Sequence, residues 1–141
     1  MRWWLTIVII ILVVIALVHF FPGSDSVARP SQPEQSDVVR VERPRADELV
    51  KSPFLVKGQA RGYWFFEASF LIELVDETGL VLGQGLAVAD GDWQTTNFVP
   101  FTATINFDSL TTNRGVLVLH KDNPSGLAEY NDEVDWPVRF R

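Results

Sequence analysis

Hydrophobic and polar residues alternate with a period of two along most of the chain after its first 37 residues. The clearest example is residues 66–75, whose apolar face comprises Phe66, Ala68, Phe70, Ile72 and Leu74. A period of two is typical of a half-buried β-strand and not of a helix. Burying one Phe side chain stabilises a fold by about 1.5–3 kcal/mol, so we expect Phe66 and Phe70 to point into the core.

Six further short segments have strand patterns: residues 38–41, 54–60, 80–88, 98–107, 116–120 and 134–140. Polar turns separate them, among them a hairpin loop at residues 76–79, and no convincing amphipathic helix lies between them. Gly83 and Gly85 indicate a bulge in the fourth strand. Seven short strands in about 100 residues predict an all-β, immunoglobulin-like antiparallel β-sandwich.

The beginning of the chain has a different pattern, because residues 3–21 carry no charged side chain. A helix needs about 20 apolar residues to cross a bilayer. Trp3 and Trp4 lie where an interfacial aromatic belt is expected, and Arg2 precedes the apolar run, which favours a cytoplasmic amino terminus. We therefore predict a transmembrane signal anchor at residues 1–21, with the rest of the chain outside the cell membrane.

A cleaved signal peptide is the alternative interpretation, with residues 26–28 as the small-residue cleavage site. The apolar region of such a peptide is usually about 7–15 residues long, which favours the uncleaved anchor. Residues 22–37 are rich in Pro, Ser, Gln and acidic residues and predict a flexible linker. Fully extended, this linker spans at most about 50 Å. Residues 38–141 then form the immunoglobulin-like domain.

Composition excludes several classes of function. The formal net charge is −6 and no Lys/Arg-rich run occurs, which argues against nucleic-acid binding, since phosphate neutralisation needs a basic face. The chain has no cysteine, so it has neither a disulfide framework nor a thiolate metal site.

Three stretches are expected to meet at one end of the sandwich, namely residues 61–65, 90–93 and 122–130. In an immunoglobulin fold the loops after the second and sixth strands lie at the same end, and the fourth strand also ends there. These stretches contain the most unusual residues of the chain, including four consecutive aromatic residues at 63–66.

Two motifs in these stretches resemble a known family. ARGYWFFEASF at residues 60–70 and KDNPSGLAEYND at residues 121–132, followed by a terminal VRF at residues 138–140, are similar to the Gmad2 family. That family consists of immunoglobulin-like domains of bacterial sporulation and spore-germination surface proteins. The resemblance implies a bacterial, extracytoplasmic, non-enzymatic domain that mediates interactions, with a link to sporulation or germination.

The candidate binding residues come from the three converging stretches. They are Tyr63, Trp64, Glu67, Trp93, Asn123 and Ser125. The aromatic residues are either an exposed patch, because aromatic side chains are enriched at binding hot spots, or a plug over the end of the core. Within the patch, Trp64 is the strongest member. Glu67 is expected to tie its loop to the turn at residues 123–126 through hydrogen bonds, and that turn serves mainly as a scaffold.

The sequence indicates no cofactor, metal or catalytic site. Oxygen ligands for calcium are present at Asp90, Asp92, Asp122 and Asn123, but without an EF-hand spacing. No Ser accompanies a recognisable His and acid. We therefore expect a membrane-anchored binding module of the cell envelope, whose partner at the loop end is a protein or a glycan. The alternative is a structural spacer or accessory subunit of a membrane complex, without a ligand site of its own.

Overall fold

The computed structural model describes residues 36–108 and 112–140. The expected anchor at residues 1–21 and nearly all of the expected linker lie outside these residues. No helix in the described part of the chain is long and apolar enough to span a membrane. The residues Gln32–Arg141 form a compact unit, and its buried core lies entirely within the described residues.

The described residues form eight strands and two short 3-10 helices. The strands are β1 (Val39–Arg43), β2 (Glu48–Leu49), β3 (Phe54–Arg61), β4 (Ser69–Asp76), β5 (Val81–Ala89), β6 (Phe98–Ile105), β7 (Arg114–His120) and β8 (Glu133–Arg139). The 3-10 helices are η1 (Gly62–Trp64) and η2 (Ala128–Tyr130). All seven expected strands are present, so the all-β prediction is confirmed.

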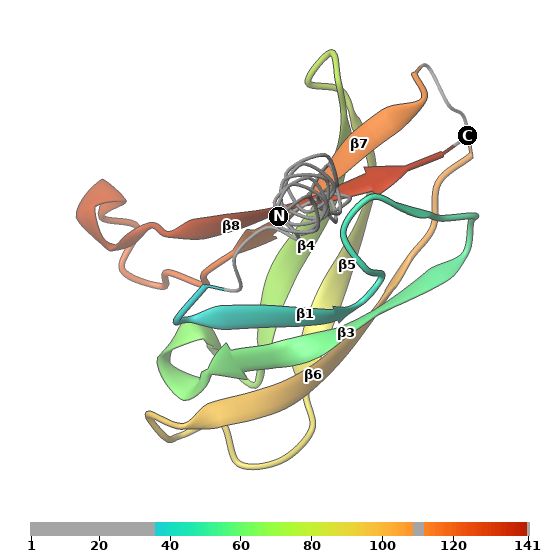
Figure 1. The fold of residues 1–141 in the computed structure, drawn as a ribbon. Coiled ribbons are helices and arrows are strands. Elements are labelled where there is room, and N and C mark those ends of the chain that lie inside the picture. The colour runs from blue at the N-terminus through green and yellow to red at the C-terminus, as the bar shows by residue number, and fades with distance from the viewer. Residues whose placement is uncertain (1–35, 109–111, 141) are drawn as a thin grey trace, which may run out of the picture. The chain divides into compact units, whose positions relative to one another are not determined.

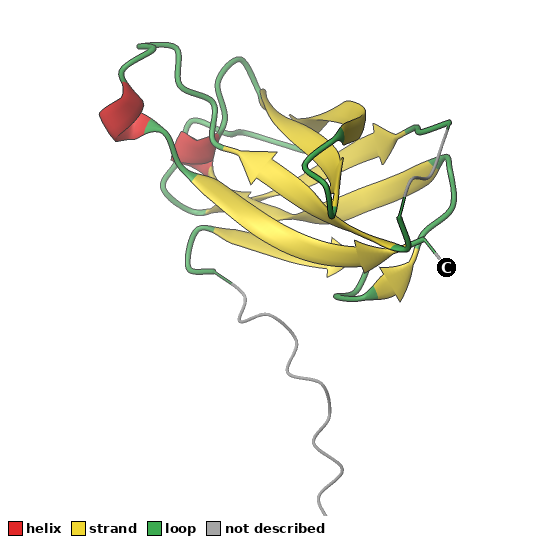
Figure 2. Ribbon diagram, turned by 90° about the horizontal axis from the view of Figure 1, so that it is seen from above, coloured by secondary structure: helices red, strands yellow, loops and turns green. Residues whose placement is uncertain are grey.

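The strands form two layers, in the order β1-β3-β6 and β5-β4-β7-β8 (Figures 1 and 2). Both layers are antiparallel, except that the two-residue β2 extends the second layer beyond β8 in parallel. The layers join at one corner, where β5 and β6 pair only through Val88 with Thr102 and Ala89 with Phe101. This is the immunoglobulin-like sandwich that the alternation predicts.

The strand β2, which has only two residues, was not predicted. It pairs in parallel with β8 through Glu48 opposite Val138 and Leu49 opposite Arg139. The described strands thus begin in the first layer with β1, and β2 then lies at the edge of the second layer. A two-residue strand is too short to produce an alternating pattern, which explains why it was missed.

Aromatic side chains link the layers inside the sandwich. The rings of Phe70 on β4 and Phe101 on β6 lie 5.0 Å apart between centroids, in an edge-on arrangement. Trp64 and Phe65 pack edge-on against Phe70 at one end of the core. Edge-to-face pairs of this kind add about 0.5–1.5 kcal/mol beyond the burial of area, so this cluster fixes how the layers meet.

The start of the third predicted strand is wrong by three residues. β4 begins at Ser69, and Glu67 and Ala68 have positive φ angles of 48° and 62°. This left-handed turn breaks the alternation, so Phe66 is 41% exposed while its neighbour Phe65 is buried. The inward positions expected further along the strand, from Phe70 onwards, are confirmed.

The bulge predicted in the fourth expected strand is present, and Gly83 lies directly beside it. The bulge in β5 lies at Leu82, because Leu74 pairs with Gly83 and Val75 pairs with Val81. A Cβ at Gly83 would lie 2.1 Å from the carbonyl oxygen of Asn106. The missing side chain therefore allows β5 to approach the backbone of the first layer, next to the bulge rather than within it.

Candidate functional site

The three stretches expected to converge do meet at one end of the sandwich, which we call the loop end. The backbone N–H of Gly62 donates to the carbonyl of Asn97 at 3.0 Å, and the N–H of Asp122 donates to the carbonyl of Trp64 at 3.0 Å. The η1 stretch is thereby bonded to both of the other loops. Figure 2 shows the two short helices, η1 and η2, at this same end.

Gly62 allows this close packing. A Cβ at this position would lie 2.0 Å from the carbonyl oxygen of Thr95 and 2.3 Å from that of Trp93. Both distances are far below contact, so only glycine permits the two backbones to approach so closely. This glycine sets the position of the Trp93 loop relative to η1.

An open hollow of about 570 Å³ lies over this junction. Its lining residues are Gly62, Tyr63, Trp93, Gln94, Thr95 and Thr96. Tyr63 is 51% exposed, and Trp93 is partly buried against the core. The hollow therefore combines two aromatic side chains with hydroxyl and amide groups from the second loop.

Hydrogen bonds within the second loop, residues 90–97 between β5 and β6, hold its backbone in place. The N–H of Gln94 donates to a carboxylate oxygen of Asp92 at 2.9 Å, and the N–H of Thr95 donates to the carbonyl of Trp93 at 2.8 Å. The residues that line the hollow beyond Tyr63 and Trp93 were not predicted, because a run of Gln and Thr in a loop has no distinctive pattern. Gly62, directly before the aromatic run, was the available signal.

Trp64 is not part of an exposed patch, so its predicted place at the surface was wrong. Its side chain is 0% exposed, and its ring centroid lies 6.5 Å from that of Phe70. Successive residues of a 3-10 helix point about 120° apart, so Tyr63 faces the hollow while Trp64 enters the core. Its indole N–H has no hydrogen-bond partner among the described residues.

The expected contact between Glu67 and the turn at residues 123–126 is also not formed. Glu67 lies in the left-handed turn before β4 and is exposed. Its carboxylate makes no hydrogen bond or ion pair within the described part of the chain. The loops are joined by the backbone bond from Asp122 to Trp64 instead, so a side-chain tie is not needed.

The turn after β7 uses its polar side chains internally. The Asn123 amide nitrogen donates to the carbonyl of Leu127 at 2.8 Å and to the side-chain oxygen of Asn131 at 2.7 Å. Ser125 donates to the side-chain oxygen of Asn123 and accepts from the N–H of Leu127 at 3.2 Å. These bonds fit the scaffolding role that the turn composition predicts.

Comparison with known families agrees with this geometry. The family model of Gmad2, the immunoglobulin-like domain of bacterial spore germination, matches residues 38–128. The chain belongs to the Gmad2 family. The match ends within η2, yet β8 pairs with β7 along its whole length, so the Gmad2 fold of this chain continues beyond the matched residues. No curated protein matches the chain. No solved structure matches it either.

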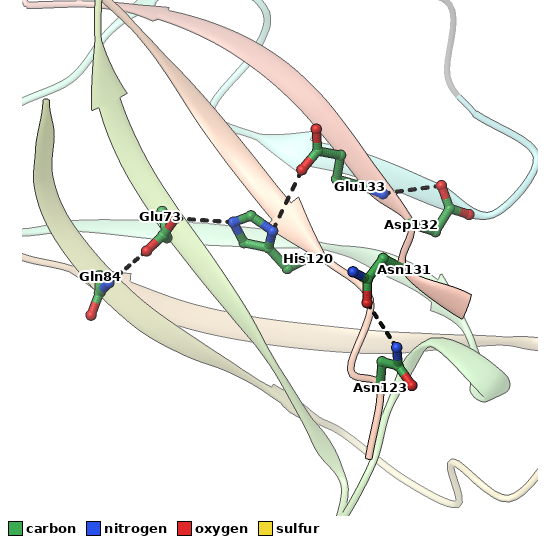
Figure 3. A network of polar contacts seen from close by, with 7 residues as sticks. All are labelled: Glu73, Gln84, His120, Asn123, Asn131, Asp132 and Glu133. Carbon is green, nitrogen blue, oxygen red and sulfur yellow. Dashed lines mark hydrogen bonds and ion pairs between the residues drawn. The ribbon is translucent and has the colours of Figure 1, made fainter. Parts of the chain in front are cut away.

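Away from the loop end hollow, the Gmad2 domain carries a polar network on the outer side of its second layer (Figure 3). His120 lies between two carboxylates, with Nε2 3.1 Å from Glu73 and Nδ1 3.7 Å from Glu133. Gln84 donates to the other oxygen of Glu73 at 2.6 Å. The network thus connects the four neighbouring strands β5, β4, β7 and β8.

This network does not have the geometry of a metal site. The two carboxylates contact different nitrogens on opposite sides of the imidazole ring, so they do not converge on one point. Among the described residues, no three His, Cys, Asp or Glu side chains come together in a way that could hold a metal ion. The network therefore cross-links strands and is not a candidate metal centre.

Proposed function

We propose that this chain is a non-enzymatic binding module of the bacterial cell envelope, and that the hollow between Tyr63 and Trp93 is its ligand site. The main observation behind this proposal is that Tyr63 is 51% exposed, while backbone hydrogen bonds of its neighbours Gly62 and Trp64 fix the η1 stretch against the two adjacent loops. A rigid aromatic side chain loses little conformational entropy on binding, and aromatic residues are enriched at binding hot spots. The ligand is an envelope protein or glycan.

The location of the module follows from the sequence and is part of the same proposal. Residues 3–21 are uncharged and long enough to anchor the chain in the cell membrane. The positive-inside rule then puts the domain on the extracytoplasmic side. The family description supports a role connected with spore germination.

A structural spacer is the second candidate. It is favoured because several of the expected binding side chains are buried or hydrogen-bonded within the domain itself. Trp64 is in the core, and Asn123 and Ser125 bond within their own turn. Of the six expected binding residues, Tyr63 and Trp93 line the hollow. If these two also prove dispensable, the domain positions other parts of an assembly instead of binding a ligand.

Co-sedimentation with purified bacterial envelopes tests the proposal. A fragment of residues 32–141 contains the whole buried core and is expected to fold independently. We expect this fragment to pellet with envelopes and a Tyr63→Ala, Trp93→Ala variant to remain in solution. Tyr130→Ala is the matched control, because Tyr130 is 52% exposed at the same end but lies outside the hollow.

The two candidates give different results. Pelleting that is lost only when the hollow is changed supports the binding module. If the parent fragment does not pellet, or if the control variant loses pelleting equally, the hollow is not the site and the spacer gains support. Circular dichroism of each variant checks that it is folded.

A further inference from the structure

The outer face of the first layer is basic, although the chain as a whole has a net charge of −6. Its cations all lie on β1 and β3, namely Arg40, Arg43, Lys57 and Arg61. The carboxylate among them is Glu42, beside the register shift of β1. The outward positions of β6 are Phe98, Pro100, Thr102 and Thr104, so this strand adds no negative charge.

The positive charge of this face is not neutralised within the described part of the chain. None of the four cations forms an ion pair there, and Glu42 instead accepts a hydrogen bond from Gln59 at 3.0 Å. Arg43 and Lys57 are direct cross-strand partners. Like charges in this position destabilise a sheet, so an external anion would relieve a repulsion that is built into the fold.

Two of the cations are held in place by an aromatic ring. The guanidinium carbons of Arg40 and Arg61 lie 3.9 Å and 4.0 Å from the ring centroid of Phe98. Arg61 also donates to the carbonyl oxygens of Asp37 at 3.1 Å and Thr96 at 3.3 Å. Such stacking limits the rotamers of the two side chains, so less entropy is lost when they bind an anionic group.

The outer face of the second layer is not basic overall. The charged outward positions on β4, β7 and β8 are Glu73, Glu133 and Asp135, with His120 between the first two, and the cross-strand pair Arg114 and Arg139. Its two guanidinium groups are outnumbered by three carboxylates, so the excess of positive charge lies on one side of the sandwich, over the first layer (Figure 1).

The chain reaches the basic face directly from its amino-terminal part. Asp37, the last residue of the expected linker, accepts a hydrogen bond from Arg61. Only 16 residues, 22–37, separate the apolar run from this point. An exposed Leu55, at 52%, lies on the same face. Exposed apolar and basic side chains together suit a lipid headgroup region.

We infer that the outer face of β1, β3 and β6 docks on an anionic phospholipid surface. The inference relies on the proposed membrane anchor but is separate from ligand binding at Tyr63 and Trp93. Each Lys or Arg near an anionic bilayer strengthens binding by about fivefold. Docking through this face turns the outer face of the second layer, with its His120 network, away from the lipid.

Spin labels on the full-length chain test this orientation. The chain has no cysteine, so Thr102→Cys and Asp135→Cys each provide one labelling site, the first on the basic face and the second on the outer face of the second layer. The labelled chains are reconstituted in nanodiscs that contain a trace of nickel-chelating lipid, either with phosphatidylglycerol or with phosphatidylcholine alone. Nickel in the headgroups relaxes a spin label that lies near the bilayer.

In phosphatidylglycerol discs we expect strong relaxation at residue 102 and weak relaxation at residue 135. The effect at residue 102 is expected to be lost in phosphatidylcholine discs, and also in 1 M salt, where the Debye length falls to about 3 Å. Arg40→Glu with Lys57→Glu should abolish it. The matched control is Arg114→Glu with Arg139→Glu, which makes the same charge change on the outer face of the second layer and should leave the effect intact.

Equal relaxation at both labels, or relaxation that does not depend on lipid charge, would overturn the inference. Failure of the chain to associate with anionic discs would overturn it as well. A further arm adds soluble poly(glycerol phosphate) to phosphatidylcholine discs. If this polymer immobilises the label at residue 102 while anionic lipid does not, the face binds a phosphodiester polymer and the lipid assignment is wrong. The Tyr63→Ala, Trp93→Ala variant, which tests ligand binding at the hollow, should show the same relaxation of the label at residue 102 as the parent chain. The two proposals can therefore fail separately.

Discussion

The two ends of the sandwich are both sealed by aromatic side chains, but they differ in what remains outside the seal. At the far end, the Phe107 ring centroid lies 6.1 Å from that of Phe54 and 5.5 Å from that of Phe140. At the loop end, Trp64 and Phe65 cover Phe70 in the same way. The loop end has further aromatic residues beyond its seal, and these line the hollow.

This difference separates the structural aromatics from the candidate functional ones. At both ends of the sandwich, packed aromatic rings cover the core. Tyr63 is not required for that purpose, since it is exposed while the rings of Trp64 and Phe65 are buried. Trp93 lines the hollow and also packs partly against the core. A test of the comparison should therefore remove one ring from each seal and one from the hollow.

Truncation of the loop-end seal is expected to have the largest effect. Removing a fully buried aromatic ring costs about 3–5 kcal/mol, and Trp64 is 0% exposed. We expect Trp64→Ala to lower the free energy of unfolding by this amount and Phe107→Ala, at 8% exposure, by somewhat less. Tyr63→Ala should change it by no more than about 0.5 kcal/mol, as for other surface substitutions. Urea denaturation of the fragment of residues 32–141 measures all three.

Trp64→Phe sharpens this prediction. It removes a buried N–H that lacks a partner among the described residues, which offsets part of the lost packing. Its effect should therefore be clearly smaller than that of Trp64→Ala. An unfolding free energy that falls as much for Tyr63→Ala as for Trp64→Ala would show that the seal and the hollow are not distinct.

The sequence predicted the layers well because the alternation reports burial directly. The period of two predicted the strand from Phe70 onwards. The arrangement of loops in an immunoglobulin-like fold predicted that the three loops converge. The orientation of the aromatic run at residues 63–66 could not be predicted in this way. A short 3-10 helix and a left-handed turn at Glu67 and Ala68 interrupt the period there.

The interruption had opposite consequences for neighbouring residues. Phe66 was expected inside and is exposed, while Trp64 was expected outside and is buried. Neither error could be corrected from composition, because both residues are large and aromatic. The basic face was missed for a different reason. Its cations are separated along β1 and β3 and become neighbours only when the two strands pair.

Closely packed glycines allow a second comparison of the two ends. At Gly62 an added Cβ would meet two carbonyl oxygens, of Thr95 at 2.0 Å and Trp93 at 2.3 Å. At Gly115, near the far end, it would meet the Phe140 ring at 2.6 Å and the carbonyl oxygen of Val75 at 2.7 Å. Both substitutions overpack the site, which typically costs about 1–3 kcal/mol.

We expect Gly62→Ala to displace the Trp93 loop and therefore to reduce envelope binding as well as stability. Gly115→Ala should reduce stability only. Thermal unfolding and envelope co-sedimentation of both variants check this. Retained binding in Gly62→Ala would mean that the ligand site tolerates a shift of the Trp93 loop. The close packing at Gly62 would then not be needed for binding.

A third comparison of the two ends concerns their polar turns. In the far hairpin, one carboxylate oxygen of buried Asp76 accepts from the N–H and hydroxyl of Thr78, at 2.8 Å and 2.6 Å, and from the N–H of Leu80 at 3.0 Å. At the loop end, Asn123 bonds within its turn but is only partly buried. Water can replace the partners of Asn123 more easily than those of Asp76.

Asp76→Ala should therefore lower the free energy of unfolding by about 1–3 kcal/mol, because it removes the acceptor of three partly buried hydrogen bonds. Asn123→Ala should lower it by about 0.5–1 kcal/mol, the net value of an exposed hydrogen bond. Urea denaturation compares the two, and Thr112→Ala, which removes one exposed side-chain bond to the carbonyl of Arg114, gives the baseline. A larger loss for Asn123→Ala than for Asp76→Ala would mean that the turn after β7 stabilises the whole loop end, including the backbone bond from Asp122 to Trp64.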